Sequence, residues 1–406
     1  MRSFIRILRI LATVAAIAAV SAHNSPKTLA PLPCQQKLSG IRALATIHPS
    51  TSSCSSSTVL TSVNRGGASG GSSVSGGLAQ SAKVLFLFAL WYALNVVYNI
   101  TNKTVLNALP LPSLVAVAQL GVGSLYATTA WASGLRKGPR HDVAALVRSG
   151  GLKALLPIGC AHGVGQVATV LSLGAGAVSF THIVKALEPL FSAGVSAVVS
   201  GEVLRPQVYA TLLPVVGGVS FAVAKELSFS WWAFGTAMLS NLSFALRAVL
   251  SKIAMLNGKG GGEAGAAIAS LSAPSLFGVV TCLSFALMAP VALVAEGKGA
   301  AAVWSASVSN SGASGPALAK SVLLSGLFHY LNNEVMYLVL DNVHPVTLAV
   351  GNTLKRVVII VASLVIFRNP MAPEAQLGSA VGIAGVLLYS LTKQYYDRVD
   401  AAAKKN

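Results

Sequence analysis

From Lys83 onward the sequence consists mainly of ten apolar stretches, each about 20 residues long, the length that crosses the hydrocarbon core of a bilayer as a helix. They run over approximately 84–103, 111–133, 152–172, 177–200, 206–224, 230–252, 275–295, 316–340, 345–367 and 373–392. The stretches are continuous rather than alternating, which favours helices over the strands of a barrel. The pattern predicts an all-α polytopic membrane protein with ten transmembrane helices.

Composition supports a membrane protein and argues against several other classes. Of the 406 residues 54% are hydrophobic and only 10% are charged, with a mean hydropathy of +0.69. A soluble domain carries about 25% charged residues. The net charge is +18, but the basic residues are scattered among apolar stretches, so we expect no nucleic-acid partner. The excess suits membrane lipid headgroups and an anionic solute. The four cysteines have no metal or disulfide spacing, and we expect neither metal nor cofactor.

The two ends of the chain differ from the apolar part. Residues 1–23 have a basic start, the apolar stretch Ile10–Val20 and a small-residue cleavage site, typical of a signal peptide. Residues 24–82 are rich in Ser, Gly and Ala without any acidic residue, which is typical of a disordered transit peptide. Together they predict import into a complex plastid, with a secreted N-terminus and a linker as the alternative. A transporter domain over 83–395 and a polar tail over 396–406 complete the expected organisation.

Two apolar stretches resemble each other. Both 177–200 and 345–367 carry a lysine near the middle, and both lead through an Arg/Pro hinge into another apolar stretch. They lie five segments apart, so halves of five helices would have opposite orientations. This pattern predicts two inverted five-helix halves with a binding site at their interface, near the membrane midplane.

Two glycine pairs have the spacing that lets helix backbones approach closely. Gly159 with Gly163 and Gly378 with Gly382 are each four residues apart within an apolar stretch. We expect these pairs to serve helix packing and not the binding of a solute.

Three cations lie deep in apolar stretches, at Lys185, Lys355 and Arg356. A cation near the bilayer centre costs roughly 2.5–3.5 kcal/mol on insertion scales. Arginine can bind a phosphate through two parallel hydrogen bonds, while lysine supplies a movable point charge. The three therefore predict an aqueous cavity that receives a phosphorylated or carboxylated solute.

Other polar residues lie beside these cations in the pattern. On a helix, Thr181, His182, Lys185 and Glu188 would share one face, so His182 is a candidate ligand. A structural ion pair between Lys185 and Glu188 is the alternative interpretation. Histidines in such positions more often serve the packing of the core.

The sixth apolar stretch adds two candidates. Arg247 follows Phe244 by three residues, so the two would lie on one face of a helix. Lys103 and Lys252 lie at the ends of apolar stretches, where we expect contact with lipid headgroups.

No pattern in the sequence indicates catalysis. It has no nucleophile elbow, metal triplet or phosphate-cradling glycine loop. It therefore predicts a transporter and not an enzyme, with a membrane receptor or scaffold as the non-transporting alternative.

Three motifs occur in order along the apolar part. They are Ser179-Phe180-Thr181-His182-Ile183-Val184-Lys185-Ala186-Leu187-Glu188-Pro189, then Asn241-Leu242-Ser243-Phe244 through Arg247 and Ser251-Lys252, then Val350-Gly351-Asn352-Thr353-Leu354-Lys355-Arg356-Val357. They resemble the fourth-, sixth- and ninth-helix signatures of the plastid phosphate translocators. The resemblance covers about 84–395 and implies the drug/metabolite transporter superfamily, with ten helices in two inverted halves. It also implies exchange of inorganic phosphate for a phosphorylated C3, C5 or C6 compound across the inner plastid envelope.

The resemblance implies a role for each candidate. Lys185, Lys355 and Arg356 match the phosphate-binding cations of the family, and Thr169 matches a hydroxyl that hydrogen-bonds the phosphate. Arg247 and Phe244 match cavity residues of the sixth helix.

Two positions depart from the triose-phosphate members. This chain has Gln166 where those members have histidine, and Asn332 where they have tyrosine. Both positions face the end of the substrate away from the phosphate, and phosphoenolpyruvate members use an amide at the first of them.

The expected function is exchange of phosphate for triose phosphate or 3-phosphoglycerate across a plastid envelope membrane. The alternatives are phosphoenolpyruvate or another sugar phosphate as substrate, or a nucleotide-sugar antiporter of the secretory pathway. The sequence leaves the oligomeric state open.

Overall fold

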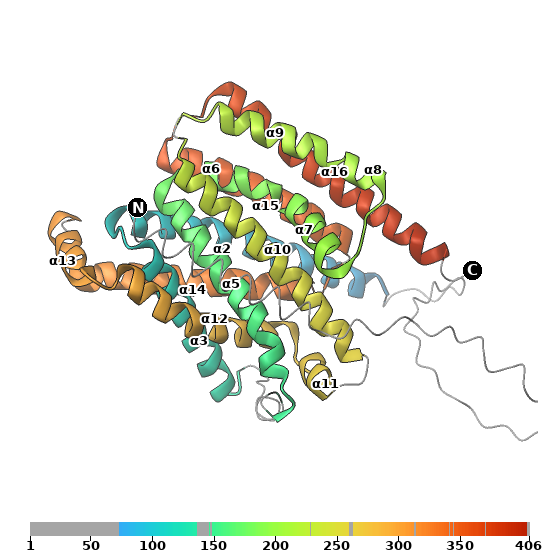
Figure 1. The fold of residues 1–406 in the computed structure, drawn as a ribbon, viewed down its shortest axis with the longest axis horizontal. Coiled ribbons are helices and arrows are strands. Elements are labelled where there is room, and N and C mark those ends of the chain that lie inside the picture. Colours follow the sequence, from blue (N-terminus) through green and yellow to red (C-terminus); the bar gives the residue numbers. More distant parts are fainter. Residues whose placement is uncertain are drawn as a thin grey trace, which may run out of the picture.

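The computed structural model describes residues 73–135, 146, 148–227, 229–259, 263–311, 314–340, 342–343, 345–369 and 371–403. These residues form helices joined by short connections (Figure 1). The helices are α2 (Ser73–Ala108), α3 (Pro112–Ala132), α5 (Gly151–Ala175), α6 (Val178–Val184), the 3-10 turn η1 (Lys185–Leu187), α7 (Glu188–Val195), the π turn η2 (Ser196–Ser200), α8 (Pro206–Ala210), α9 (Leu212–Ala224), α10 (Trp231–Lys259), α11 (Glu263–Ala269), α12 (Ala273–Glu296), α13 (Ala300–Ser311), α14 (Gly315–Leu340), α15 (Pro345–Phe367) and α16 (Pro373–Ala403).

Within this described part, nine helical segments are long and apolar enough to cross a membrane. They are α2, α3, α5, α6 through η2, α8 with α9, α10, α12, α15 and α16. The tenth expected span forms α14, which has 26 residues but is less apolar because it carries Lys320, His329 and Glu334 among others. The prediction of an all-helical polytopic membrane protein is confirmed.

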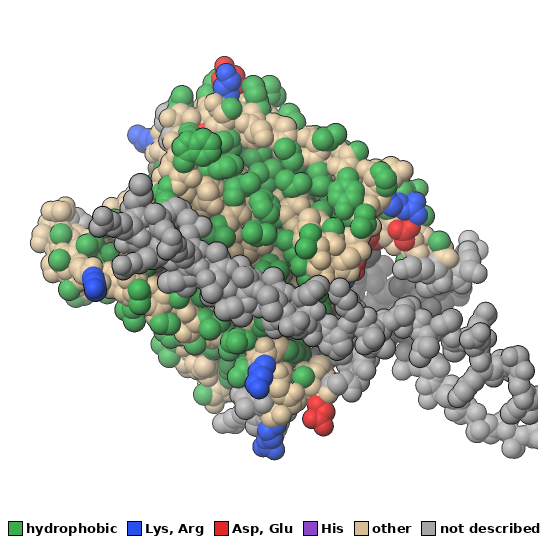
Figure 2. All heavy atoms as spheres, viewed as in Figure 1, with side chains coloured by type: hydrophobic (Ala, Val, Ile, Leu, Met, Phe, Trp, Pro, Cys, Tyr) green, Lys and Arg blue, Asp and Glu red, His purple; other side chains and the backbone are tan. Residues whose placement is uncertain are grey.

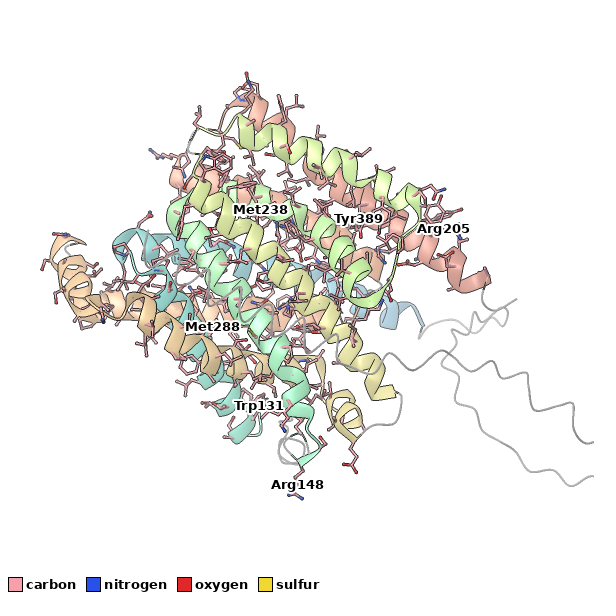
Figure 3. All side chains as sticks on the ribbon, viewed as in Figure 1. Trp131, Arg148, Arg205, Met238, Met288 and Tyr389 are labelled. Carbon is pink, nitrogen blue, oxygen red and sulfur yellow. The ribbon has the colours of Figure 1, made fainter. Side chains whose placement is uncertain are left out.

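Side chains on the outside of the bundle are suited to lipid. Leu125, Val198 and Val365 are each more than 60% exposed although they lie in membrane-spanning segments. Figure 2 shows hydrophobic side chains spread over one face, with the visible charged side chains near its margins. In Figure 3, Arg148 and Arg205 lie at the edges of the bundle, while Met238 and Met288 lie among its helices.

The helices pack in pairs from distant parts of the chain. In Figure 1, α5 and α10 run together through the middle of the bundle, and α9 and α16 run together along one edge. Further contacts join α2 with α14, α3 with α12, α3 with α14 and α5 with α12.

Glycines allow some of these helices to approach closely. A Cβ on Gly218 of α9 would lie 2.4 Å from the backbone nitrogen of Gly382 in α16, and one on Gly378 would lie 2.8 Å from the backbone oxygen of Gly218. A Cβ on Gly163 would lie 2.5 Å from a methionine side chain of α12, and one on Gly159 2.8 Å from a leucine side chain. The packing role predicted for both glycine pairs is confirmed.

The fourth span is not the single helix that 177–200 predicts, because it changes pitch at Lys185. Pro189 has no N–H to donate to the carbonyl of Lys185, and the N–H of Glu188 donates to that carbonyl instead, which makes a 3-10 turn. The Asn241 side chain of α10 donates to the neighbouring Val184 carbonyl at 2.9 Å. Proline thus places Lys185 on a tight turn in the middle of the span.

Only parts of the predicted ends of the chain lie within the described residues. The proposed signal peptide, 1–23, and most of the proposed transit segment, 24–82, lie outside the described residues. Helix α2 begins at Ser73, so the last residues of that segment are helical. Helix α16 continues to Ala403 and includes most of the expected tail 396–406, because the apolar pattern that ends near residue 392 marks the end of the membrane span and not of the helix.

Candidate functional site

All nine residues that were predicted to bind the substrate line one cavity of about 410 Å³. They come from five parts of the fold and are Gln166 and Thr169 (α5), His182 and Lys185 (α6 and η1), Phe244 and Arg247 (α10), Asn332 (α14), and Lys355 and Arg356 (α15). The volume lies in the range of small-ligand pockets. Among the described residues, the lining contains four Lys or Arg side chains and one carboxylate, so the cavity is suited to an anion.

Lys185 is oriented by hydroxyl groups. Its Nζ donates to Ser240 Oγ at 2.7 Å and to Thr169 Oγ1 at 3.2 Å, and it lies 4.6 Å from the centre of the Phe244 ring. The two hydroxyl oxygens are themselves 2.7 Å apart. An ammonium group has three donors, so one remains for a ligand. Ser240 had no place in the sequence-based site, because its contact depends on how α10 packs against α5.

Arg356 forms the ion pair of the cavity. Its guanidinium lies 2.6 Å from Glu188 Oε2, and the two side chains are 13% and 43% exposed. The alternative of an ion pair between Lys185 and Glu188 is therefore wrong, because Glu188 pairs with Arg356 and not with Lys185. Glu188 instead joins α7 to α15 and offsets one of the three central cations.

Lys355 lies against an aromatic ring. Its Nζ is 4.5 Å from the centre of the Trp91 ring, which is almost fully buried. Such a cation–π contact contributes about 0.5–2 kcal/mol. Within the described part of the chain, neither Lys355 nor Lys185 has a carboxylate at ion-pair distance. Both ammonium groups therefore line the cavity without an ion pair to any described carboxylate.

A second group of side chains lies around Arg247. Its guanidinium nitrogen is 3.0 Å from His162 Nδ1, and its guanidinium carbon is 5.0 Å from the centre of the Phe244 ring. His162 Nε2 is buried without a partner among the described residues, as are both ring nitrogens of His329. Both histidines line the cavity but were missed in the sequence. His162 lies about one helical turn before Gln166, and His329 about one turn before Asn332. That spacing would place each histidine on the same helix face as the candidate residue that follows it.

The remaining candidates are held by hydrogen bonds. Gln166 Nε2 donates to Gln119 Oε1 at 2.8 Å and to the Tyr98 hydroxyl at 3.1 Å. Asn332 Nδ2 donates to two carbonyls of its own helix. His182 Nε2 is 2.9 Å from Asn99 Oδ1.

Three residues have partners that the sequence did not predict. Thr181 was placed on the face of Lys185, but it is buried with its hydroxyl 2.9 Å from Ser172. Lys252 pairs with Glu202 at 2.6 Å. Lys103 does not need a lipid headgroup, because its Nζ donates to two carbonyls at the end of α5, at 2.8 and 2.9 Å.

Residues 82–390 match the Triose-phosphate Transporter family. The chain belongs to this family. The match spans the same region as the motif resemblance, and membership of the triose-phosphate transporter family makes the protein an integral membrane transporter and not an enzyme.

Three relatives within the triose-phosphate transporter family are similar to nearly the same extent. Glucose-6-phosphate/phosphate translocator 2, chloroplastic, of Arabidopsis thaliana is 39% identical, over 78% of this chain and 76% of its own. Phosphoenolpyruvate/phosphate translocator 1, chloroplastic, of Oryza sativa subsp. japonica is 39% identical, over 80% and 75%. The triose phosphate/phosphate translocator, non-green plastid, chloroplastic, of Brassica oleracea var. botrytis is 38% identical, over 79% and 75%. Identity alone therefore does not select among the three substrates in these names.

Proposed function

We propose that the protein exchanges inorganic phosphate for phosphorylated C3 compounds, triose phosphate or 3-phosphoglycerate, across a plastid envelope membrane. The observation that carries the proposal is the cavity in which Lys185 and Lys355 lack a carboxylate partner among the described residues and Arg356 has one. Each of the three relatives is named for a phosphorylated compound and for phosphate, which supports phosphate as the common partner.

The phosphate binds between the central cations. Lys185 and Lys355 offer ammonium donors, Arg356 offers a planar guanidinium, and Thr169 offers a hydroxyl that already contacts Lys185. A phosphate dianion offsets both unpaired lysines. It also competes with Glu188 for Arg356, so that Glu188 acts as the counter-ion of this arginine while the cavity is empty.

This charge balance makes exchange obligatory. Closing the empty cavity removes water from three cations that lack a carboxylate partner among the described residues, Lys185, Lys355 and Arg247, which costs several kcal/mol per ion. Closing it around phosphate or a phosphate ester avoids that cost. The carrier therefore changes sides only when it is loaded, and each outward passage requires an inward one.

The other end of the cavity binds the carbon part of the substrate. Arg247, Gln166 and Asn332 supply polar groups there, and Phe244 supplies an apolar wall next to Lys185. Phosphoenolpyruvate is the second candidate substrate, because Gln166 resembles the amide that phosphoenolpyruvate members have at this position. Its test is the ratio of 3-phosphoglycerate to phosphoenolpyruvate uptake in phosphate-loaded liposomes.

The two halves are proposed to be inverted repeats, and the packing pairs support this. Number the ten spans in chain order, with α14 as the eighth, and replace each span by its counterpart in the other half, five positions away. The α5–α10 contact then corresponds to the α14–α2 contact, and the α3–α14 contact corresponds to the α12–α5 contact. The α9–α16 and α3–α12 contacts turn into themselves. Lys185 and Lys355 then lie in equivalent spans of the two halves and reach one cavity between them.

The proposed membrane is a plastid envelope, and the relatives' names contain the word chloroplastic. Import into a complex plastid rests on the two-part composition of residues 1–82 alone. Fusing these residues to a fluorescent protein in an alga with such a plastid tests the idea. A reporter that remains in the secretory pathway would contradict it.

The transport proposal is tested with the purified protein in liposomes. Uptake of labelled phosphate should require phosphate or a phosphate ester inside the liposomes. In a panel of C3, C5 and C6 phosphates, the C3 phosphates should compete most strongly with the labelled phosphate. Equal uptake into liposomes without internal substrate would refute exchange. Competition by nucleoside monophosphates alone would favour a nucleotide-sugar antiporter.

A further inference from the structure

Gln119 of α3 joins four helices but does not line the cavity. Its side chain is fully buried. Its Nε2 donates to Asn102 Oδ1 of α2 at 2.8 Å and to Ser325 Oγ of α14 at 2.9 Å. Its Oε1 accepts from Gln166 Nε2 of α5 at 2.8 Å and, at 3.4 Å, from the Tyr98 hydroxyl of α2. Both amide hydrogens are thus engaged on one side, which directs the amide oxygen to Gln166 and Tyr98.

We propose that Gln119 is a positioning residue that sets the carbon-end selectivity of the transporter by fixing the amide of Gln166. This inference rests on the proposed function, in which Gln166 contacts the carbon part of the substrate. The Gln166 amide nitrogen donates to Gln119 and to the Tyr98 hydroxyl. Turning that amide breaks both hydrogen bonds in a buried region, where water does not replace them.

The effect is confined to the carbon end. Lys185 donates to Thr169 and Ser240, and Arg356 is held by Glu188. None of these hydrogen bonds passes through Gln119. Loss of Gln119 therefore leaves the phosphate contacts in place and releases the Gln166 amide.

The main test is Gln119→Leu in the full-length protein, purified and placed in liposomes loaded with phosphate. The ratio of 3-phosphoglycerate to phosphoenolpyruvate uptake should change roughly two- to tenfold, as one lost or gained hydrogen bond implies. Phosphate–phosphate exchange should stay within about twofold of the wild type, which also shows that the variant is folded. An unchanged ratio with intact phosphate exchange would overturn the proposal.

Gln119→Glu keeps an oxygen for the Gln166 amide to donate to. The Asn102 amide nitrogen, which has no partner in the described part of the chain, and the Ser325 hydroxyl can both donate to the new carboxylate. This variant should keep the wild-type uptake ratio. A shift as large as that of Gln119→Leu would overturn the proposal, because the Gln119 oxygen would then not be what holds Gln166.

Ser325→Ala is a milder variant that removes one anchor of Gln119, and Ser379→Ala is its matched control. Both serines are buried, but the Ser379 hydroxyl donates only to Ala375 of its own helix. Ser325→Ala should move the uptake ratio and Ser379→Ala should not. If Gln119→Leu also abolishes phosphate exchange, an unchanged ratio in Ser325→Ala overturns the proposal. Failure of the proposed function is distinguishable, because the wild type would then show no phosphate-dependent uptake.

Discussion

Replacing Glu188 by glutamine removes the one negative charge that, among the described residues, offsets a central cation. The Glu188 carboxylate lies 2.6 Å from the Arg356 guanidinium, and glutamine keeps its size while removing its charge. In the empty variant, Arg356 joins Lys185, Lys355 and Arg247 as a fourth cation of the cavity without a carboxylate partner among the described residues. We expect the empty protein to be less stable, and a bound phosphate to recover part of the loss.

The exposure of the pair sets the size of this effect. An exposed ion pair contributes about 0.2–1 kcal/mol, whereas breaking a buried one costs about 3–5 kcal/mol. Arg356 is 13% exposed and Glu188 is 43% exposed, which places their pair between these limits. The empty Glu188→Gln protein should therefore lose about 1–3 kcal/mol. Phosphate affinity should rise by up to the same free energy, since phosphate no longer competes with the carboxylate.

Thermal unfolding of the purified protein with and without phosphate measures both effects. Glu188→Gln should unfold at a lower temperature than the wild type without phosphate, and phosphate should raise its unfolding temperature by more. Glu202→Gln is the matched control, because it breaks the Lys252 pair at 2.6 Å where both side chains are about half exposed. The reasoning is refuted if Glu188→Gln behaves like Glu202→Gln in both conditions.

Three further changes test other parts of the site and fold. Lys185→Gln or Lys355→Ala removes a cation that every substrate shares, so exchange of phosphate and of all esters should fall together in liposome assays; a changed preference alone would contradict this. Gln166→His or Asn332→Tyr should change the ratio of 3-phosphoglycerate to phosphoenolpyruvate uptake several-fold, at about 0.5–1.5 kcal/mol for one hydrogen bond, while phosphate–phosphate exchange survives. Gly378→Val forces a side chain against the backbone of α9 and should cost at least about 1–3 kcal/mol, seen as a lower unfolding temperature; unchanged stability would mean that this backbone contact is not kept.

The helical spans were predictable because each span is a local property of the sequence. About 20 apolar residues in a row favour a membrane helix wherever they occur, so the spans around α3, α12 and α15 follow from composition alone. The change of pitch at Lys185 was harder to predict. It follows from Pro189 through one missing hydrogen bond, and the pattern of apolar residues does not register it.

The charged residues of the site were predictable, because burying a charge in a membrane span costs free energy. The residues whose role depends on their neighbours in the folded protein were much less predictable. A lysine or arginine in the middle of an apolar stretch is expensive, so Lys185, Lys355 and Arg356 stand out in the sequence itself. A serine or histidine in such a stretch costs less and attracts less notice. Ser240 and His329 acquire their significance only through the helix packing that brings them to the cavity or to its lysine.

The glycine contact between α9 and α16 also restricts how the cavity can change shape. Backbone lies directly against backbone at Gly218 and Gly378, where no side chain can repack to absorb sliding, and Val215 and Val219 pack beside these glycines. A shift of one residue along either helix would press a Cβ into the backbone of the other helix. We therefore expect the two helices to move together as one rigid unit along one edge of the bundle (Figure 1). Helix α16 contributes Val386 and Ser390 to the cavity wall. We expect this part of the wall to stay fixed to the α9–α16 pair, and the opening and closing movements of exchange to occur in the helices on the other side of the cavity.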